Sequence, residues 1–217
     1  MAAMGESEAA APGRGSALDD RGLRTVSRLR PEDWLNAAQR RLVHGGIDAV
    51  KIGPLAEDLT VTRGSFYWHF RDRNHLLETL LSQWRGQSRE MFERLVGGDG
   101  ASGMEEFVRL VHLWVDESEF DPSLESAMRD WARTSDDVSA VVKTVDEERI
   151  AYIKRIFLDF GYGEDEAFIR ARITYFHQVG YYTIGYNESL DARMALLPMY
   201  VYVLTGKFAP EEIAEYF

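Results

Sequence analysis

The chain lacks cysteine and has no long apolar run. Its 217 residues include no cysteine, which excludes disulfide bonds, a thiolate zinc site and cysteine-based redox sensing. The longest apolar run, residues 194–204, is interrupted by Pro198, whereas a membrane helix needs about 20 apolar residues. Residues 1–11 show neither the basic start nor the apolar stretch of a signal peptide. We therefore expect a soluble cytoplasmic protein without a membrane partner, in which residues 194–204 belong to the core.

Catalytic patterns are equally scarce. No two histidines stand three or four positions apart and no Glu-x-x-His occurs, which argues against a di-iron site. The glycine-rich segment 97–103 lacks the lysine and the preceding strand of a phosphate-binding loop. The acidic clusters at 146–148 and 164–166 are typical of solvated helix faces and helix starts. The sequence predicts a protein that is not an enzyme and that needs no cofactor or metal.

The net charge of −11 is unevenly distributed along the chain. Residues 21–95 hold thirteen Lys and Arg against nine Asp and Glu, a balance of +4. Residues 96–217 hold eleven against twenty-three, a balance of −12. Only the N-terminal part has the basic field that favours contact with phosphates, and the acidic remainder should face away from them. This asymmetry indicates a protein with two functional parts.

The apolar periodicity is helical, and no segment alternates as a β-strand does. Pro31 opens a first helix, with Glu32 and Asp33 in its first turn, and Gly45-Gly46 ends it. Further breaks are marked by short polar, glycine or proline segments. We predict an all-α fold of about nine helices at residues 31–44, 54–59, 62–70, 74–95, 104–119, 122–134, 136–160, 164–186 and 189–205.

Composition divides the chain into three parts. Residues 1–27 are rich in Ala, Gly and Ser without periodicity, which predicts a disordered arm. Residues 28–75 are expected to form a three-helix domain and residues 76–217 a helical bundle, with the helix at 74–95 connecting the two. Five arginines along the arm and its exit either keep it soluble or contact phosphates and the minor groove of DNA: Arg14, Arg21, Arg24, Arg28 and Arg30.

The segment from 54 to 70 has the pattern of a helix-turn-helix. A short apolar-periodic stretch at 54–59 and the segment 62–70 are separated by only two residues, Thr60-Val61. In such a motif the second helix enters the DNA major groove. Thr62 is a natural N-cap, and Phe66 and Phe70, four positions apart, can face the core together. Gly64 and Ser65 are small enough for the helix start to approach a phosphate.

Together these residues resemble the TetR family of bacterial repressors. The family pattern, approximately Val-[Ser/Thr]-x-Gly-[Ser/Thr]-[Leu/Phe]-Tyr-x-[His/Tyr]-Phe, stands here as Val-Thr-Arg-Gly-Ser-Phe-Tyr-Trp-His-Phe at 61–70. The resemblance covers residues 31–80, and the remainder agrees in helix count. Segments 129–134 and 146–149 also resemble a C-terminal subgroup of the family. The resemblance implies an N-terminal helix-turn-helix domain followed by an effector-binding and dimerisation domain.

The resemblance also implies which side chains contact double-stranded DNA. Arg63 pairs with guanine or binds phosphate, and Ser65 can do either. Trp68 contacts a thymine methyl or a sugar, or else is part of the core. Tyr67 and His69 contact the DNA backbone in one interpretation, whereas in the other Tyr67 is a packing residue and His69 a capping or surface residue. The expected DNA-binding residues are Lys51, Thr62, Arg63, Gly64, Ser65, Tyr67, Trp68, His69 and Arg73.

The chain departs from the family pattern at two places. Thr60 stands where the family usually has glycine or another residue that tolerates positive φ, and a β-branched residue is costly there, which favours a turn built differently. Gly53-Pro54 replaces a basic residue early in the first motif helix, which removes one phosphate contact and one amide donor. Neither departure alters the recognition segment itself.

Aromatic residues are frequent in the C-terminal part, where they build a core and can also wall a cavity. By resemblance such a cavity lies among the middle helices, and the predicted ligand-binding residues are Trp114, Trp131, Tyr175 and His177. The helices at 164–186 and 189–205 are apolar on more than one face and predict a homodimer that reads a pseudo-palindromic operator.

The sequence thus predicts a sequence-specific DNA-binding transcriptional regulator, a repressor released from its operator by a small, mostly apolar ligand. The alternative is a non-catalytic helical ligand-binding or scaffold protein whose motif no longer binds DNA. The net acidity and the departures at Thr60 and Gly53-Pro54 favour this alternative. The identity of the effector, the operator sequence and the choice between repression and activation are not encoded in these patterns.

Overall fold

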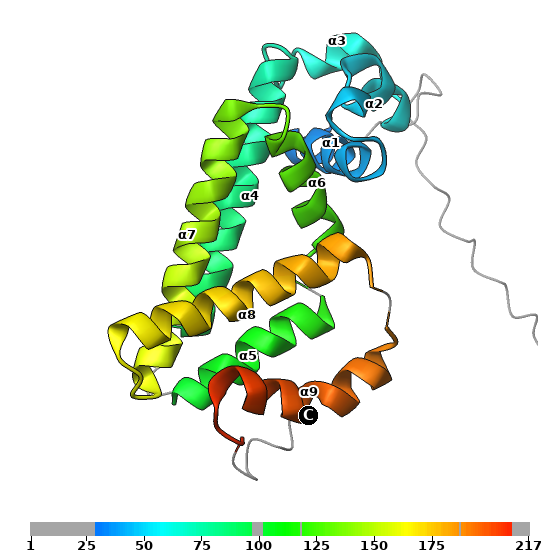
Figure 1. Ribbon diagram of the computed structural model, residues 1–217. Helices are drawn as coiled ribbons and strands as arrows, with labels where there is room; N and C mark the ends of the chain where they lie inside the picture. The colour runs from blue at the N-terminus through cyan, green and yellow to red at the C-terminus, as the bar shows by residue number, and fades with distance from the viewer. Residues whose placement is uncertain (1–28, 97–101, 118, 187, 210–217) are drawn as a thin grey trace, which may run out of the picture. The chain divides into compact units, whose positions relative to one another are not determined.

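The computed structural model describes residues 29–96, 102–117, 119–186 and 188–209. Within these ranges it has nine α-helices, one short 3-10 helix and no strand, which confirms the all-α prediction. The elements in Figure 1 are α1 (Pro31–Gly45), η1 (Ile47–Ala49), α2 (Ile52–Asp58), α3 (Arg63–Phe66), α4 (Arg73–Val96), α5 (Gly103–Asp116), α6 (Pro122–Ala132), α7 (Asp136–Asp159), α8 (Glu164–Ile184) and α9 (Leu190–Thr205). The predicted disordered arm at 1–27 lies outside the described residues.

The first three α-helices pack around aromatic side chains. Trp34 of α1 and Phe66 of α3 are fully buried, and their ring centroids lie 5.3 Å apart with an edge-to-face geometry. Phe70 is also buried, with its ring centroid 5.5 Å from that of Phe66. The prediction that Phe66 and Phe70 face the core together is confirmed. Since the core takes this side of the motif, the other side chains of residues 62–69 are left for the surface.

The second motif helix is shorter than predicted. It ends at Phe66, and residues 67–69 continue as turns in which the amide of His69 donates to the carbonyl of Phe66 over 2.9 Å. Tyr, Trp and His are weaker helix formers than the long aliphatic residues, so little favours a further helical turn there. Thr62 is the N-cap, as predicted, but its hydroxyl makes no capping hydrogen bond.

The turn between α2 and α3 corrects one expectation. Thr60 has φ 56°, so the turn keeps the left-handed residue of the family pattern, and the prediction of a different construction is wrong. That conformation costs an L-residue about 1–2 kcal/mol. The amide of Thr60 donates to the carbonyl of Glu57 over 3.0 Å, and the amide of Val61 to that of Ala56 over 2.9 Å. These bonds close the end of α2 and hold Thr60 in its strained conformation.

The start of α4 is fixed to the loop that precedes α2. Asp72 caps α4 by accepting from the amide of His75 over 2.8 Å. In the first turn of the helix, Arg73 donates from Nε to the carbonyl of Val50 over 2.5 Å and from Nη2 to the carbonyl of Ile47 over 2.7 Å. The proposed domain boundary at 75/76 falls inside α4, so one helix carries residues of both parts.

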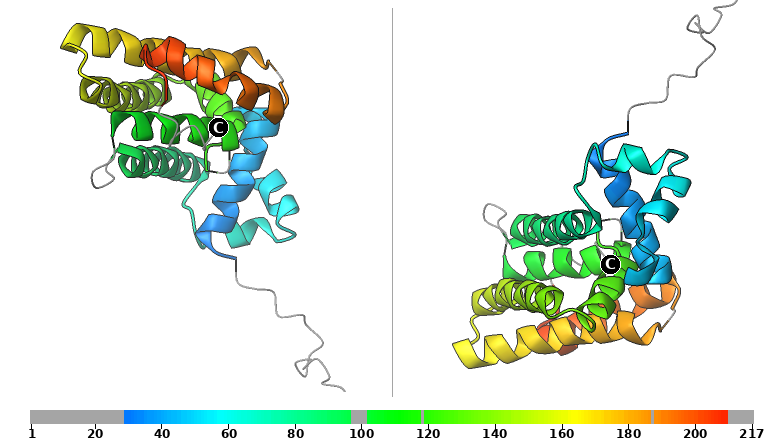
Figure 2. Two further views of the ribbon diagram at one scale, coloured as in Figure 1. Left: turned by 90° about the horizontal axis from the view of Figure 1, so that it is seen from below. Right: turned by 90° about the horizontal axis from the view of Figure 1, so that it is seen from above.

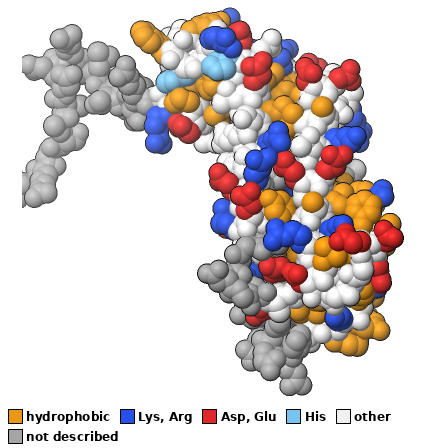
Figure 3. All heavy atoms as spheres, turned by 90° about the vertical axis from the view of Figure 1, so that its left-hand side faces the viewer, with side chains coloured by type: hydrophobic (Ala, Val, Ile, Leu, Met, Phe, Trp, Pro, Cys, Tyr) orange, Lys and Arg blue, Asp and Glu red, His pale blue; other side chains and the backbone are white. Residues whose placement is uncertain are grey.

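The remaining helices pack in two directions. Figures 1 and 2 show α4 and α7 side by side, while α8 crosses the end of α7 and lies over α5. A core of apolar side chains fills the space between α5, α7, α8 and α9, with Phe107 and Phe157 fully buried at a centroid distance of 5.7 Å. Basic and acidic side chains are interleaved over the face that Figure 3 shows.

Capping residues set where several of these helices begin. Ser102 and Glu105 form a capping box at the start of α5. Asp121 accepts from two amides at the start of α6, and Ser135 and Ser189 cap α7 and α9. The helices α5 to α9 start within one residue of the predicted positions, whereas α2 starts two residues earlier than predicted. The helices α5, α6 and α8 end two or three residues earlier than predicted.

A charged group lies at the centre of the helices α4, α6, α7 and α8. Arg149 of α7 is only 2% exposed, and its Nη1 and Nη2 lie 2.6 and 2.8 Å from the two carboxylate oxygens of Glu125 on α6. Its Nε donates to the hydroxyl of Ser88 on α4 over 2.9 Å, and the indole of Trp84 donates to Glu125 over 2.9 Å. Burial alone lowers the pKa of Arg149, but the pairing with Glu125 outweighs burial and raises it.

A second ion pair extends this cluster toward α8. Arg129 holds Asp146 through two hydrogen bonds of 2.9 and 2.7 Å. The hydroxyl of Tyr175 on α8 accepts from Arg129 over 2.9 Å and donates to Asp146 over 2.6 Å. Burial raises the pKa of this hydroxyl to about 12, so it stays protonated at neutral pH. The two pairs together connect four helices through hydrogen bonds whose lengths fix their register.

We predict that Arg149→Met lowers the free energy of unfolding by about 3–5 kcal/mol, because it leaves the Glu125 carboxylate buried without its counter-charge. Urea denaturation followed by circular dichroism measures the change. The control is Arg133→Met, which changes an exposed arginine at the C-terminal end of α6 that pairs with Asp130. It should lower the free energy of unfolding by less than about 1 kcal/mol. A loss at Arg149 no larger than that at Arg133 would contradict the prediction.

Candidate functional site

The surface of the helix-turn-helix carries two exposed aromatic side chains. Trp68 is 85% exposed and Tyr67 is 61% exposed, although both are large apolar residues. The interpretation of Trp68 as part of the core is therefore wrong. Arg63 and Gly64 are exposed beside them, and Ser65 and His69 are half-buried. An aromatic surface with a cation and hydroxyl groups on one motif suits contacts with sugars, phosphates and base edges.

The side chain of Arg63 rests on the first motif helix. A Cβ atom at Gly53 would come within 2.8 Å of Nη2 of Arg63, so the guanidinium lies over this glycine. The departure at Gly53 thus makes room for the arginine. Pro54 lies in the first turn of α2, where the backbone amides have no partner within the helix. The missing amide of this proline therefore costs no helical hydrogen bond.

The remaining predicted contact residues differ in their surroundings. Lys51, the N-cap of α2, is exposed, and so is Thr62 at the start of α3. Arg73, by contrast, is half-buried and binds the carbonyls of Ile47 and Val50. Its role as a phosphate contact stays a prediction, and the structure gives it a positioning role that the sequence did not indicate.

The four predicted ligand-binding residues do not share one cavity. Trp114 and His177 line a cavity of about 60 Å³ between α5, α8 and α9. Trp131 lines a larger one of about 750 Å³, which α1, α6 and α8 bound. Tyr175 lines neither, and its hydroxyl belongs to the pair of Arg129 and Asp146. Their assignment as ligand contacts remains a prediction.

The smaller cavity contains polar atoms that pattern reasoning missed. Thr174 is 1% exposed and Gln178 is also buried. Oγ1 of Thr174 has no hydrogen-bond partner among the described residues, and the amide of Gln178 lies near the hydroxyl of Tyr182. Both side chains line the cavity. Part of the His177 ring is exposed, but the packing of the rest lowers its pKa, so the ring is neutral at neutral pH. One sequence feature indicates that Thr174 and Gln178 are buried: they are four positions apart and lie on the same face of α8 as Ala167 and Ala171.

Apolar side chains cover the outer faces of α8 and α9. They include five on α8 and six on α9, all exposed: Phe168, Ile169, Ile173, Phe176, Ile184, Leu190, Leu196, Met199, Tyr200, Tyr202 and Val203. The expectation that residues 194–204 belong to the core holds for one stripe of this helix: Leu197 and Val201 are buried, and Met194 and Leu204 pack against the core partly buried. Isolated monomers seldom expose so many neighbouring apolar residues.

The described residues show no other recognisable reactive centre. No three His, Asp or Glu side chains among them are arranged to hold a metal ion. No helix in the described ranges has the length and hydropathy needed to cross a membrane.

Comparisons with known proteins agree with this architecture. Residues 35–80 match the family described as bacterial regulatory proteins, tetR family. A TetR transcriptional regulator from Legionella pneumophila superposes with a TM-score of 0.64 and 15% identity, over 86% of this chain and 100% of the other. The fatty acid degradation regulator FadR from Bacillus halodurans superposes with a TM-score of 0.63 and 14% identity, over 85% of this chain and 97% of the other. The reduced form of E. coli NemR superposes with a TM-score of 0.62 and 14% identity, over 82% of this chain and 97% of the other. No curated protein sequence matches this chain.

The family match covers the helix-turn-helix, and the solved structures share the fold of the whole described chain. Both findings agree with the motif at residues 61–70 and with the order of the nine helices described above. Residues 35–80 therefore carry the helix-turn-helix domain of the tetR family, and the chain has the fold of the solved regulators to which it is similar.

Proposed function

We propose that this protein is a sequence-specific repressor that binds a pseudo-palindromic operator as a homodimer and leaves it when a small, mostly apolar ligand binds. The observation that carries the DNA-binding part is the exposed face of the motif, where Trp68, Tyr67 and Arg63 project away from the core that Phe66 and Phe70 anchor. Such a protein acts where the chromosome is, and we place it in the cytoplasm.

The charge distribution supports this orientation toward DNA. The +4 balance of residues 21–95 contrasts with −12 over residues 96–217. Several of the N-terminal arginines are occupied within the protein: Arg41 pairs with Asp58 at 2.7 Å, and Arg85 and Arg89 both pair with Glu148 at 3.0 Å. Lys51 and Arg63 are among the exposed cations that remain in the described part of this region.

We predict that Arg63→Ala weakens binding to the operator by about 1–3 kcal/mol per half-site and relaxes base preference, because it removes a paired contact to guanine. Lys51→Ala should instead weaken all DNA sequences alike and reduce the salt dependence by roughly one charge per half-site. Gel shifts on the upstream region of the protein's own gene and on random DNA, at several salt concentrations, measure both effects.

Two results would change these assignments. Equal losses on specific and random DNA for Arg63→Ala reassign Arg63 to a phosphate contact. Absence of binding to either DNA by the unaltered protein supports the alternative of a helical ligand-binding or scaffold protein. Arg73 is unsuitable as the phosphate variant, because its removal also frees the carbonyls of Ile47 and Val50.

The homodimer is supported by the apolar surface of α8 and α9. Burying this surface against a second copy removes it from water, and burial of apolar area contributes about 25 cal/mol for each Å². A two-fold arrangement of this kind also presents two motifs to the two half-sites of a palindrome, about 34–36 Å apart.

We predict a species of twice the chain mass of 24.8 kDa in light scattering at micromolar concentration. Ile173→Asp with Phe176→Asp should give the monomer, because two carboxylates would be buried without partners. Trp68→Asp changes an equally exposed aromatic residue outside α8 and α9 and should leave the dimer intact. A monomeric unaltered protein would exclude the proposed arrangement.

The cavity of Trp114 and His177 supports the effector part of the proposal. Its walls are mostly apolar, and Thr174 and Gln178 provide orienting polar atoms, of which Oγ1 of Thr174 has no partner among the described residues. At about 60 Å³ it admits only a small group unless α8 or α9 moves. Because α9 also presents the dimer surface, such a movement would change the separation of the two motifs.

We predict that Thr174→Val raises the free energy of unfolding by about 1 kcal/mol, because the hydroxyl is buried without a hydrogen bond, and that it abolishes the response to effector. Thr183→Val is the matched control on α8: its hydroxyl donates to the carbonyl of Val179, so no gain is expected. Thermal melts and operator release with small apolar molecules that carry one hydroxyl or carboxyl group, phenol and benzoate among them, measure both. If no such molecule raises the melting temperature of the unaltered protein, the cavity is only a packing defect.

A further inference from the structure

The larger cavity has a different composition from the one assigned to the effector. It has a volume of about 750 Å³, within the range of about 300–1,000 Å³ typical of small-molecule sites. Its walls come from the end of α1 and from η1 on one side and from α6 and the end of α8 on the other. Its features point to a ligand class that the smaller cavity would not accept.

Carboxylates dominate the charged side chains of this cavity. Asp48, Glu117, Asp130 and Glu188 line it, and Arg193 is the one basic residue among its lining side chains, all of which lie in the described part of the chain. Arg193 is already occupied: its Nη1 donates to Glu117 over 2.9 Å and its Nη2 to the carbonyl of Trp114 over 3.0 Å. Outside the lining, Arg133 lies 3.7 Å from Asp130. Among the described residues, Asp48 and Glu188 are therefore the lining carboxylates without an arginine or lysine partner, and they leave the cavity with an excess of negative charge.

Helix ends add to this negative potential. The cavity is lined by Gly45 at the C-terminal end of α1, by Trp131 next to the last residue of α6, and by Gly185, the C-cap of α8. The C-terminal end of a helix carries about half an elementary negative charge, because its last carbonyls have no partner within the helix. Three such ends at one cavity favour a cation.

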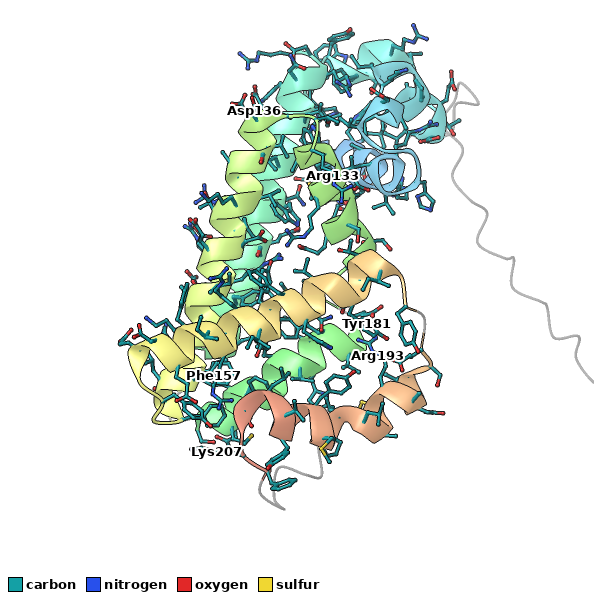
Figure 4. The ribbon with its side chains drawn as sticks, in the orientation of Figure 1. Arg133, Asp136, Phe157, Tyr181, Arg193 and Lys207 are labelled. Atoms are coloured by element: carbon teal, nitrogen blue, oxygen red, sulfur yellow. The ribbon has the colours of Figure 1, made fainter. Side chains whose placement is uncertain are left out.

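Aromatic rings form the apolar part of the wall. Trp131, Tyr181, Tyr182 and Tyr186 all line the cavity. The guanidinium of Arg193 lies 5.1 Å from the centroid of the Tyr181 ring, so one of these rings already binds a cation through its face. Figure 4 shows Tyr181 on α8 and Arg193 on α9 next to each other. Aromatic faces and carboxylates together are the groups that bind an organic cation with little water around it.

We propose that this cavity is a second ligand site, for a hydrophobic organic cation such as a quaternary ammonium or phosphonium compound. Such a ligand contacts the end of α1 and η1 on one side and α6 and α8 on the other, which links the helix-turn-helix to the C-terminal helices. The proposal goes beyond DNA recognition and the apolar effector, because the ligand chemistry differs and the two cavities share only Tyr181, Glu188 and Arg193 among their lining residues. It requires no DNA and is tested on the isolated full-length protein.

The test compares two ions of the same size and opposite charge. Calorimetry in sodium buffer should show saturable binding of tetraphenylphosphonium at one site per chain, and no such binding of tetraphenylborate. Asp48→Asn with Asp130→Asn should weaken phosphonium binding about tenfold, since each removed carboxylate contributes a partly screened ion pair. Tyr186→Leu, at an exposed ring, should weaken it about threefold by removing one aromatic face without a folding defect.

Two controls localise the binding. Asp48, Asp130 and Tyr186 line only the larger cavity, whereas His177 lines only the smaller one, so His177→Ala should leave phosphonium binding unchanged. Glu78→Gln removes an exposed carboxylate on α4, outside both cavities, and should also have no effect. Equal binding of the two ions, unaltered binding by the double variant, or an equal loss in Glu78→Gln would overturn the proposal.

Discussion

The arrangement of the helices depends on one buried ion pair, that of Arg149 with Glu125. Taking two charges out of water is costly, and the cost is offset only when every donor and acceptor finds a partner at good geometry. Here Ser88 and Trp84 supply those partners from α4, while Glu125 and Arg149 come from α6 and α7. Apolar side chains can slide past one another, but these groups cannot do so without exposing an unpaired charge. The pair therefore restricts the four-helix region to one register.

A second set of polar contacts lies at the start of α4, the helix that carries Trp84 and Ser88. Arg73 opens α4 and binds two carbonyls of the segment between α1 and α2, whereas Trp84 and Ser88, farther along α4, reach the buried ion pair. A shift of α4 relative to α7 must therefore either carry the segment before α2 with it or break charge-assisted bonds. The helix α4 thus connects the buried ion pair with the segment that precedes the motif through side-chain hydrogen bonds at both places.

The local features of the chain were predictable, and those that depend on distant contacts were not. Phe66, Phe70 and Asp72 act within a few residues of their partners, so spacing alone predicts their roles. Arg149 and Glu125 are separated by 24 positions on different helices, and nothing in either segment distinguishes them from surface charges. The sequence around Arg73 likewise indicates only a surface cation, because the carbonyls of Ile47 and Val50 that it binds are more than 20 positions away. Residue type alone predicts the ligand-binding set of Trp114, Trp131, Tyr175 and His177. Because residue type does not specify which side of a helix faces a cavity, these residues do not line one common cavity.

The resting position of Arg63 has a thermodynamic consequence for recognition. Its guanidinium lies over Gly53. If Arg63 reads a base, as proposed, it must leave this position on binding, and the apparent affinity for DNA then falls with the share of free molecules that hold it there. A larger side chain at position 53 would exclude this conformation and raise the competent population. Position 53 thus controls the resting conformation of Arg63 without itself belonging to the surface that we propose for DNA.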